Sequence, residues 1–173
     1  MAKRTVYIFD SSAFITLHQH STRVIELPQA IWDELATMMS KGVITSHIYV
    51  YEEIVSEATE NPDFITKWLL TKKNNFEAAS AEQAIEVAAI IEKFPKLIDP
   101  EQEKEQADPW IVAQAIILDR QTNLLDEVEY VVVTQENPNS TKKIPAACKH
   151  FKVRCISLKT FFEETNIKIE KSS

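Results

Sequence analysis

Short apolar runs alternate with amphipathic segments along the chain. Residues 6–9 (VYIF) are apolar at every position, and residues 131–133 (VVV) have the same character. Continuous apolar runs are typical of parallel strands, because helices cover both faces of a parallel sheet. Shorter strand candidates lie at residues 43–44 and 153–156. The pattern therefore predicts a central, mostly parallel sheet.

Helical patterns occupy the intervals between these predicted strands. Residues 28–40 begin with a proline and place apolar side chains at helical spacing. A cap at Ser46 begins a second predicted helix, which runs to about residue 59. The sequence SAEQ at residues 80–83 is typical of a capping box, and it precedes an apolar helix that reaches about residue 94.

Two more helices are predicted in the second half of the chain. The sequence ADP at residues 107–109 places Asp108 at an N-cap and a proline at the first helical position. Residues 110–118 are apolar nearly all round, so this helix is expected to be buried. Ser157 precedes a last helix that carries two phenylalanines. Strands that alternate with helices predict a three-layer α/β/α sandwich.

Length and composition fit one globular domain. The chain has 173 residues, of which 45% are hydrophobic and 26% are charged, and this is ordinary for a folded domain. No repeat or linker divides it. We expect a single domain over residues 1–166 and a disordered tail over residues 167–173.

Several classes of protein are excluded by what the sequence lacks. The chain has a single glycine, Gly42, so no glycine-rich nucleotide-binding loop can be written. Cys148 and Cys155 form no CxxC motif, which argues against zinc and suits free thiols in a reducing compartment. No apolar run reaches the roughly 18 residues of a membrane span. The apolar stretch near the N-terminus is too short for a signal peptide. We expect a cytoplasmic protein without a membrane partner.

The net charge of −7 bears on nucleic-acid binding. Non-specific binding rests on lysine and arginine side chains that meet phosphates, so an acidic chain is a poor general nucleic-acid coat. An enzyme that reaches phosphates through bound divalent cations has an acidic site, and the charge does not exclude this class.

Four acidic residues are expected at one edge of the sheet. Asp10 follows the first strand directly, and Glu136 follows residues 131–133 after Thr134 and one further residue. Asp108 opens the buried helix, and Glu53 lies about two turns into the helix after the second strand. Sites in parallel sheets form beyond the carboxyl ends of the strands. Because clustered carboxylates repel one another, the pattern indicates a site for Mg²⁺ or Mn²⁺.

Each acid also has a purely structural interpretation. Asp108 before a proline suits a helix cap, and Glu53 beside Glu52 suits a solvated helix face. Glu136 suits a turn. Ser11 and Ser12 suit caps of a helix that begins near Ala13. Asp10 is the hardest to explain this way, because an acid beside an apolar strand end needs a partner or solvent.

Taken in order, four segments resemble the PIN domain family. They are YIFDSSAFI at 7–15, VYEEI at 50–54, ADPWIVAQA at 107–115 and VVVTQE at 131–136, and the segment at 142–164 resembles the ending of one subgroup. Within the family the chain is similar to VapC-like ribonucleases, and in particular to an uncharacterised subgroup of the DUF4411 type. The resemblance spans nearly the whole chain.

The resemblance implies a set of catalytic residues. PIN domains hold Mg²⁺ or Mn²⁺ with three or four acids, and these match Asp10, Glu53, Asp108 and Glu136. Asp10, Glu53 and Asp108 would hold the metal, with Glu52 as an alternative register for Glu53. Many relatives have aspartate in place of Glu136, which leaves its direct metal contact open. Ser12 and Thr134 match supporting polar positions.

The implied function is metal-dependent cleavage of RNA phosphodiester bonds by an endoribonuclease, and this enzyme would be the toxin of a toxin–antitoxin pair. The implied partners are an RNA substrate, an antitoxin protein and a second copy of the chain. Lys142 and Lys143 begin a basic segment that is either a solvated surface or a track for the RNA backbone.

Two other classes of protein share some of these features. A phosphatase of the haloacid-dehalogenase type also begins with a strand and an aspartate, but it needs a second aspartate two residues on, where this chain has Ser12. A PIN-like fold kept only for protein binding is the remaining alternative. The presence of all four acidic positions argues against a degenerate site.

Overall fold

A computed structural model of the chain describes residues 3–23, 29–56, 62–122 and 126–168. Its centre is a sheet of five strands in the order β3-β2-β1-β4-β5. All neighbouring strands are parallel. The strands are β1 (Arg4–Phe9), β2 (Ile44–His47), β3 (Phe76–Glu77), β4 (Val128–Val133) and β5 (Arg154–Ile156).

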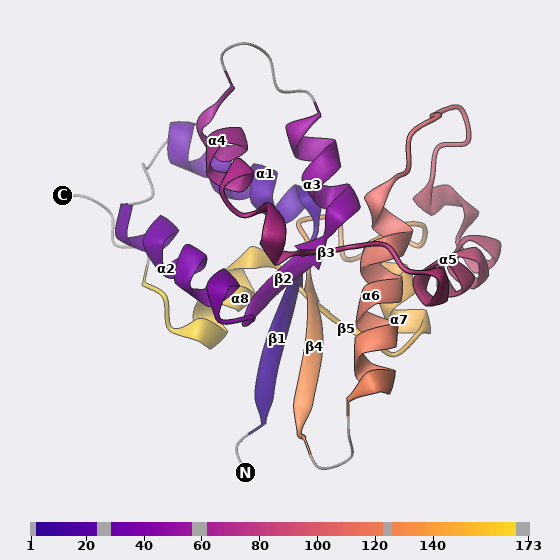
Figure 1. The fold of residues 1–173 in the computed structure, drawn as a ribbon. Coiled ribbons are helices and arrows are strands. Elements are labelled where there is room, and N and C mark those ends of the chain that lie inside the picture. Colours follow the sequence, from indigo (N-terminus) through magenta and orange to yellow (C-terminus); the bar gives the residue numbers. More distant parts are fainter. Residues whose placement is uncertain (1–2, 24–28, 57–61, 123–125, 169–173) are drawn as a thin grey trace.

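Helices cover both faces of this sheet, which confirms the predicted three-layer α/β/α architecture. In Figure 1, α5, α6 and α7 lie to the right of the strands, and α1, α2, α4 and α8 lie to the left. The α-helices are α1 (Ser11–Arg23), α2 (Gln29–Ser40), α3 (Ile48–Val55), α4 (Phe64–Leu70), α5 (Ala81–Lys93), α6 (Ala107–Gln121), α7 (Ile144–His150) and α8 (Leu158–Thr165). Two 3-10 helices are η1 (Lys73–Asn75) and η2 (Pro95–Leu97).

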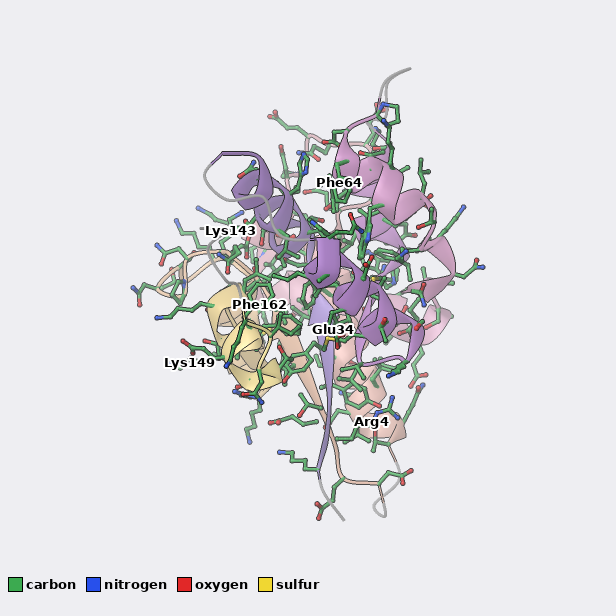
Figure 2. All side chains as sticks on the ribbon, turned by 90° about the vertical axis from the view of Figure 1, so that its left-hand side faces the viewer. Arg4, Glu34, Phe64, Lys143, Lys149 and Phe162 are labelled. Atoms are coloured by element: carbon green, nitrogen blue, oxygen red, sulfur yellow. The ribbon has the colours of Figure 1, made fainter. Side chains whose placement is uncertain are left out.

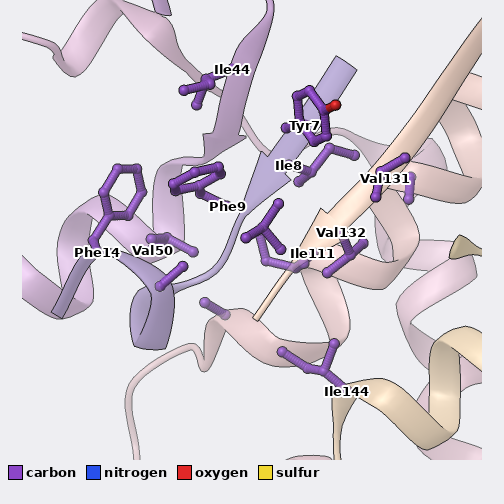
Figure 3. Packing of buried hydrophobic residues seen from close by; sticks show 14 of the residues in the cluster. Tyr7, Ile8, Phe9, Phe14, Ile44, Val50, Ile111, Val131, Val132 and Ile144 are labelled. Carbon is purple, nitrogen blue, oxygen red and sulfur yellow. The ribbon is translucent and has the colours of Figure 1, made fainter. Parts of the chain in front are cut away.

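The two central strands form the middle of the core. Ile8 and Val132 are fully buried, and Ile111 of α6 packs with them (Figure 3). On the other face, the ring of Phe161 in α8 lies 4.9 Å from the ring centres of both Tyr7 and Phe9. Burying both faces of β1 and β4 explains why their sequences are apolar at successive positions.

The strands run in one direction, so the sheet has one carboxyl edge. In Figure 2, Arg4 at the start of β1 lies toward the lower end of the molecule, and Lys143 lies in the upper half. The ends of β1, β2 and β4, and the starts of the helices that follow them, gather in this upper half (Figure 1). Candidate chemistry from distant parts of the sequence is therefore expected there.

Most predicted elements are confirmed, and the capping box at Ser80 and Gln83 is present at the start of α5. The predicted cap at Ser46 is wrong. Ser46 is buried within β2, where its hydroxyl donates to the Phe9 carbonyl at 2.5 Å. The N-cap of α3 is His47, whose Nδ1 accepts from the amide of Tyr49. The two-residue strand β3 is too short to leave a pattern in the sequence.

Some predictions fall on parts of the chain that the structure does not describe. Pro28, Thr59 and residues 169–173 lie outside the described residues. The division into a domain over residues 1–166 and a tail stays a prediction. Among the described residues, no helix is long and apolar enough to cross a membrane.

Candidate active site

The ends of β1 and β4 bring Asp10 and Thr134 together. The two strands are neighbours, and their register pairs Phe9 with Val133. Asp10 and Thr134 follow these residues directly, and the Asp10 amide donates to the Val133 carbonyl at 3.1 Å. Pairing between the two most apolar strands therefore places the first acid beside its predicted supporting residue.

The carboxylate of Asp10 is buried, with the residue only 3% exposed. Its Oδ1 accepts from the Ser12 hydroxyl at 2.8 Å and from the Ala13 amide at 2.9 Å. Its Oδ2 accepts from the Thr134 hydroxyl at 2.7 Å. Burial raises the pKa of Asp10 to about 6, because desolvation of the charge outweighs these three donors.

The bond from Ala13 also makes Asp10 the residue that caps α1. The helix begins at Ser11, so the alternative in which Ser11 and Ser12 cap a helix starting near Ala13 is wrong. Capping restrains the orientation of the Asp10 carboxylate and does not compete with a role in a site.

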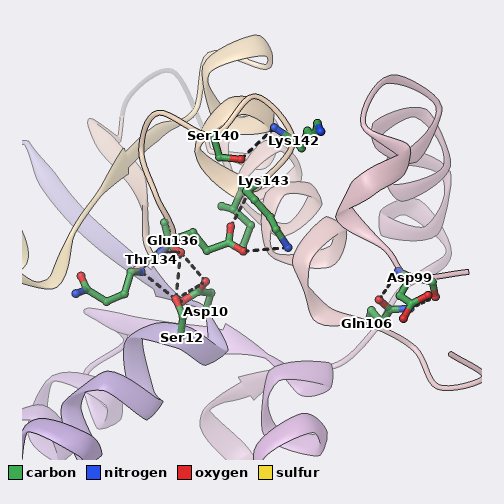
Figure 4. Close-up of polar contacts among 11 residues, drawn as sticks. Asp10, Ser12, Asp99, Gln106, Thr134, Glu136, Ser140, Lys142 and Lys143 are labelled. Carbon is green, nitrogen blue, oxygen red and sulfur yellow. Dashed lines mark hydrogen bonds and ion pairs between the residues drawn. The ribbon is translucent and has the colours of Figure 1, made fainter. Parts of the chain in front are cut away.

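Ser12 and Thr134 form a polar bridge around Asp10, as Figure 4 shows. Their hydroxyl oxygens lie 3.2 Å apart. The Ser12 hydroxyl accepts from the Gln135 amide at 2.9 Å, and the Gln135 side chain accepts from the Leu158 amide at 2.8 Å. This chain of bonds joins β1, the loop after β4 and the start of α8. Gln135 is a support that the sequence analysis missed, although it lies between two of the residues named there.

The structure distinguishes Glu53 from Glu52. Glu52 is exposed, whereas Glu53 is partly buried and turned toward the site. Glu53 Oε1 accepts from the amide of Ala107 at 2.7 Å, and its Oε2 accepts from the hydroxyl of Ser11. Glu53 therefore connects α3 to the starts of α1 and α6. The sequence analysis considered Ser11 only as a helix cap and missed its contact with Glu53, for which the position next to Asp10 is the only signal in the sequence.

Glu53 changes the interpretation of Asp108. The N-cap of α6 is Gln106, and Asp108 is the second residue of the helix. The prediction that Asp108 caps this helix is therefore wrong. Glu53, which is distant in sequence, satisfies the free amide at the helix start. Among the described residues, no group donates a hydrogen bond to the Asp108 carboxylate.

The carboxyl group of Asp108 carries the largest electrostatic cost in the site. Burial, followed by repulsion from Glu136, Asp10 and Glu53, raises its pKa to about 8, and Lys143 offsets part of this effect. All four predicted acids therefore interact electrostatically at the carboxyl edge of the sheet.

Glu136 is engaged with the start of α7. Its Oε2 accepts from the amide of Ile144, the first residue of α7, at 2.8 Å. Its Oε1 lies 3.9 Å from the Nζ atom of Lys143. Glu136 thus holds the start of α7 and positions Lys143 beside the acids (Figure 4). Direct metal ligation is less suited to Glu136 than to Asp108.

The donor chemistry of the site fits a hard divalent cation. Among the described residues, no three acidic, histidine or cysteine side chains converge closely enough to hold an ion by themselves. Mg²⁺ in proteins commonly uses one or two carboxylates and keeps several waters. Asp10 and Asp108 could supply those carboxylates, and Glu53 has further oxygen lone pairs for water. An ion would also relieve the repulsion that raises the pKa of Asp108.

Asp108→Asn is expected to stabilise the metal-free protein at high pH. The folded protein keeps the Asp108 proton up to about pH 8, whereas the unfolded chain loses it near pH 4. The stability contributed by this raised pKa is complete below about pH 4 and is lost as the pH rises through about 8. Thermal unfolding in EDTA should show Asp108→Asn more stable than the parent by about 2 kcal/mol at pH 8. The difference should shrink as the pH falls toward 5.

Asp119→Asn provides the matched control for this measurement, because Asp119 is exposed near the other end of α6. It should change stability little at either pH. An Asp108→Asn protein that is less stable than the parent at pH 8 would show that the carboxylate is a structural support.

Comparisons with known proteins place the fold. A solved structure from Rickettsia felis, the crystal structure of VapBC2 bound to a DNA fragment from their promoter, contains a similar chain with a TM-score of 0.50. The identity is 14%, and the match covers 88% of this chain and 98% of that chain. At this identity the likeness concerns the fold, which is PIN-like. A search of curated proteins finds no significant match. The family model for the domain of unknown function DUF4411 matches residues 7–169, and the chain therefore belongs to the DUF4411 family.

Proposed function

We propose that the chain is a divalent-metal-dependent endoribonuclease that hydrolyses RNA phosphodiester bonds. One observation carries the proposal: the Asp108 carboxylate has no hydrogen-bond donor among the described residues, and the repulsion of three other acids helps to raise its pKa to about 8. Such an arrangement is costly for folding, and it is typical of sites where a ligand later compensates the charge. Mg²⁺ or Mn²⁺ is the ligand whose chemistry matches these oxygens.

Each residue of the site would have a separate role. Asp10 and Asp108 would hold the ion, and Glu53 would orient water at its edge. Ser12 and Thr134 keep the Asp10 carboxylate in one orientation through bonds of 2.8 and 2.7 Å. Glu136 holds Lys143 near the acids, where its charge can receive a phosphate. When bound, the metal supplies an activated water and neutralises charge on the phosphate.

A cleavage assay with purified protein tests this function. Single-stranded RNA should be cut in the presence of Mg²⁺ or Mn²⁺, and EDTA should abolish the cleavage. Readdition of Mn²⁺ in excess should restore it. Cleavage that persists unchanged in EDTA would contradict the proposal. A chain that binds no divalent ion and cuts no RNA would instead favour a PIN-like protein-binding module.

We also propose that the chain acts as the toxin of a toxin–antitoxin pair. Support comes from the fold that it shares with a chain of VapBC2, and from large apolar side chains exposed on two adjacent helices. Ile15 of α1 is 39% exposed, and Phe64 and Leu70 of α4 are 42% and 48% exposed. Exposed apolar side chains on neighbouring elements are a feature of protein interfaces. Expression of the chain alone should slow growth, and co-expression of its antitoxin should relieve this; normal growth under strong expression would argue against toxicity.

A further inference from the structure

A cleft of about 320 Å³ lies directly beside the acids. Glu53 and Asp108 line it from the acidic site, and the segment between α5 and α6 provides much of the remaining wall. Its lining residues are Glu53, Lys96, Leu97, Ile98, Asp99, Gln102, Gln106, Asp108 and Lys143. The proposed chemistry at Asp108 does not by itself use this space.

The loop that forms the wall is fixed by its own hydrogen bonds. The Asp99 amide donates to Gln106 Oε1 at 2.7 Å, and Gln106 Nε2 donates to the Asp99 carbonyl at 2.8 Å (Figure 4). The Glu101 amide donates to the Asp99 carboxylate at 3.0 Å. Gln106 is also the N-cap of α6. The pair of hydrogen bonds between Asp99 and Gln106 therefore fixes the loop relative to Asp108. The hydrogen bonds of its wall therefore give the cleft a defined shape.

Two lysines bring positive charge to this cleft. Lys96 lies in η2 immediately before Leu97, which is 3% exposed, and Lys143 immediately precedes Ile144, which is fully buried. Each lysine therefore has an anchored backbone and an exposed side chain. The Nζ atom of Lys143 also forms an ion pair with Oε1 of Glu136 at 3.9 Å. Within the described residues, Lys96 makes no ion pair, so its charge is available to a ligand.

The negative charge of the acids and of an approaching RNA strand indicates what these lysines could do. An RNA strand brings negative phosphates toward Glu53 and Asp108, in a chain whose net charge is −7. A metal ion between the acids can offset the charge of the phosphate that reacts, but a neighbouring phosphate needs cations of its own. Lys96 and Lys143 line the space next to the acids. Lys142, which the sequence analysis paired with Lys143, is not among the residues that line it.

We propose that this cleft is a nucleotide subsite in which Lys96 and Lys143 bind a backbone phosphate next to the one that is cleaved. The inference rests on the proposed ribonuclease function and deepens it. A volume of about 320 Å³ is at the lower end of ligand pockets and suits one nucleotide unit. Gln102, which also lines the cleft, can offer an amide group to its sugar or base, so the subsite positions the strand relative to Asp108.

The test measures binding of a fluorescent single-stranded RNA oligonucleotide in an Asp10→Asn background, with and without Lys96→Gln or Lys143→Gln. Each lysine variant should weaken binding about 5-fold at low salt, and the slope of log affinity against log salt should fall by about 0.7 for each lost contact. Lys93→Gln and Lys149→Gln are the matched controls, because both lysines are exposed and lie outside the cleft. The controls should leave the affinity and the slope close to those of the background.

Cleavage kinetics with otherwise unchanged protein separate this inference from the proposed function. Lys96→Gln should raise KM several-fold and leave kcat nearly unchanged, as expected for a contact that binds without reacting. Metal-dependent cleavage with Lys96 and Lys143 variants that match the controls in affinity and slope would overturn the subsite alone. Lysine-dependent binding without any cleavage would support a phosphate-binding cleft and overturn the ribonuclease.

Discussion

Asp10→Asn is expected to lower metal-dependent RNA cleavage by at least about 1000-fold, which corresponds to about 4 kcal/mol of lost transition-state stabilisation. The substitution removes the charge of the acid at the centre of the site and keeps its shape. The remaining carbonyl oxygen can still accept from Ala13 and Ser12, which donate to Oδ1 in the parent. The result is measured as the initial rate of cleavage in Mg²⁺ or Mn²⁺.

The fold should survive this substitution. Burial raises the pKa of Asp10 to about 6, so the ionised carboxylate costs stability above that pH. Removing it should not lower the melting temperature at pH 7.5, and circular dichroism can verify this. Asp119→Asn is the control, because it removes an exposed aspartate near the C-terminal end of α6. A folded Asp10→Asn protein with parental activity would show that Asp10 is only the cap of α1.

Glu53→Gln is expected to reduce both cleavage and Mn²⁺ affinity by about 10- to 100-fold, whereas Glu52→Gln should change neither. The two residues are adjacent, but only Glu53 contacts Ala107 and Ser11. Glutamine retains a carbonyl oxygen that can accept from Ala107, so the link between α3 and α6 is kept. Loss of a group that orients a metal's surroundings commonly has an effect of this size.

Because Glu52 and Glu53 are adjacent, comparing their glutamine variants shows which of the two acids belongs to the site. Equal losses from Glu52→Gln and Glu53→Gln would mean that the effect comes from the net charge of α3. A loss confined to Glu52→Gln would contradict the site. Isothermal titration with Mn²⁺ gives the affinity independently of cleavage.

Much of the fold and part of the site could be predicted from local pattern. The buried faces of β1 and β4 require apolar residues at successive positions, and this requirement is visible in residues 6–9 and 131–133. Asp10 could be identified because a charged side chain directly after such a strand needs a polar partner or solvent. The segment order then supplied Asp108, Glu53 and Glu136 as partners through its resemblance to a known family.

What could not be predicted depends on contacts between distant segments. Local chemistry favours Asp108 as a cap, but Glu53 supplies the acceptor for the helix start from another helix. Local chemistry also favours Ser46 as a cap, whereas in the structure it is buried and its hydroxyl donates to the Phe9 carbonyl. Lys96 gave no signal at all, since its place beside Asp108 depends on how residues 99–106 fold back on themselves.

The central claim is that Asp10 and Asp108 together bind a divalent ion. A crystal structure of the protein soaked in Mn²⁺, with anomalous scattering data, tests it most directly. We predict one anomalous peak coordinated by carboxylate oxygens of Asp10 and Asp108, which should be absent in the Asp10→Asn protein under the same conditions. A map with no peak at this edge of the sheet at millimolar Mn²⁺, or with a peak that persists unchanged in Asp10→Asn, would contradict the account.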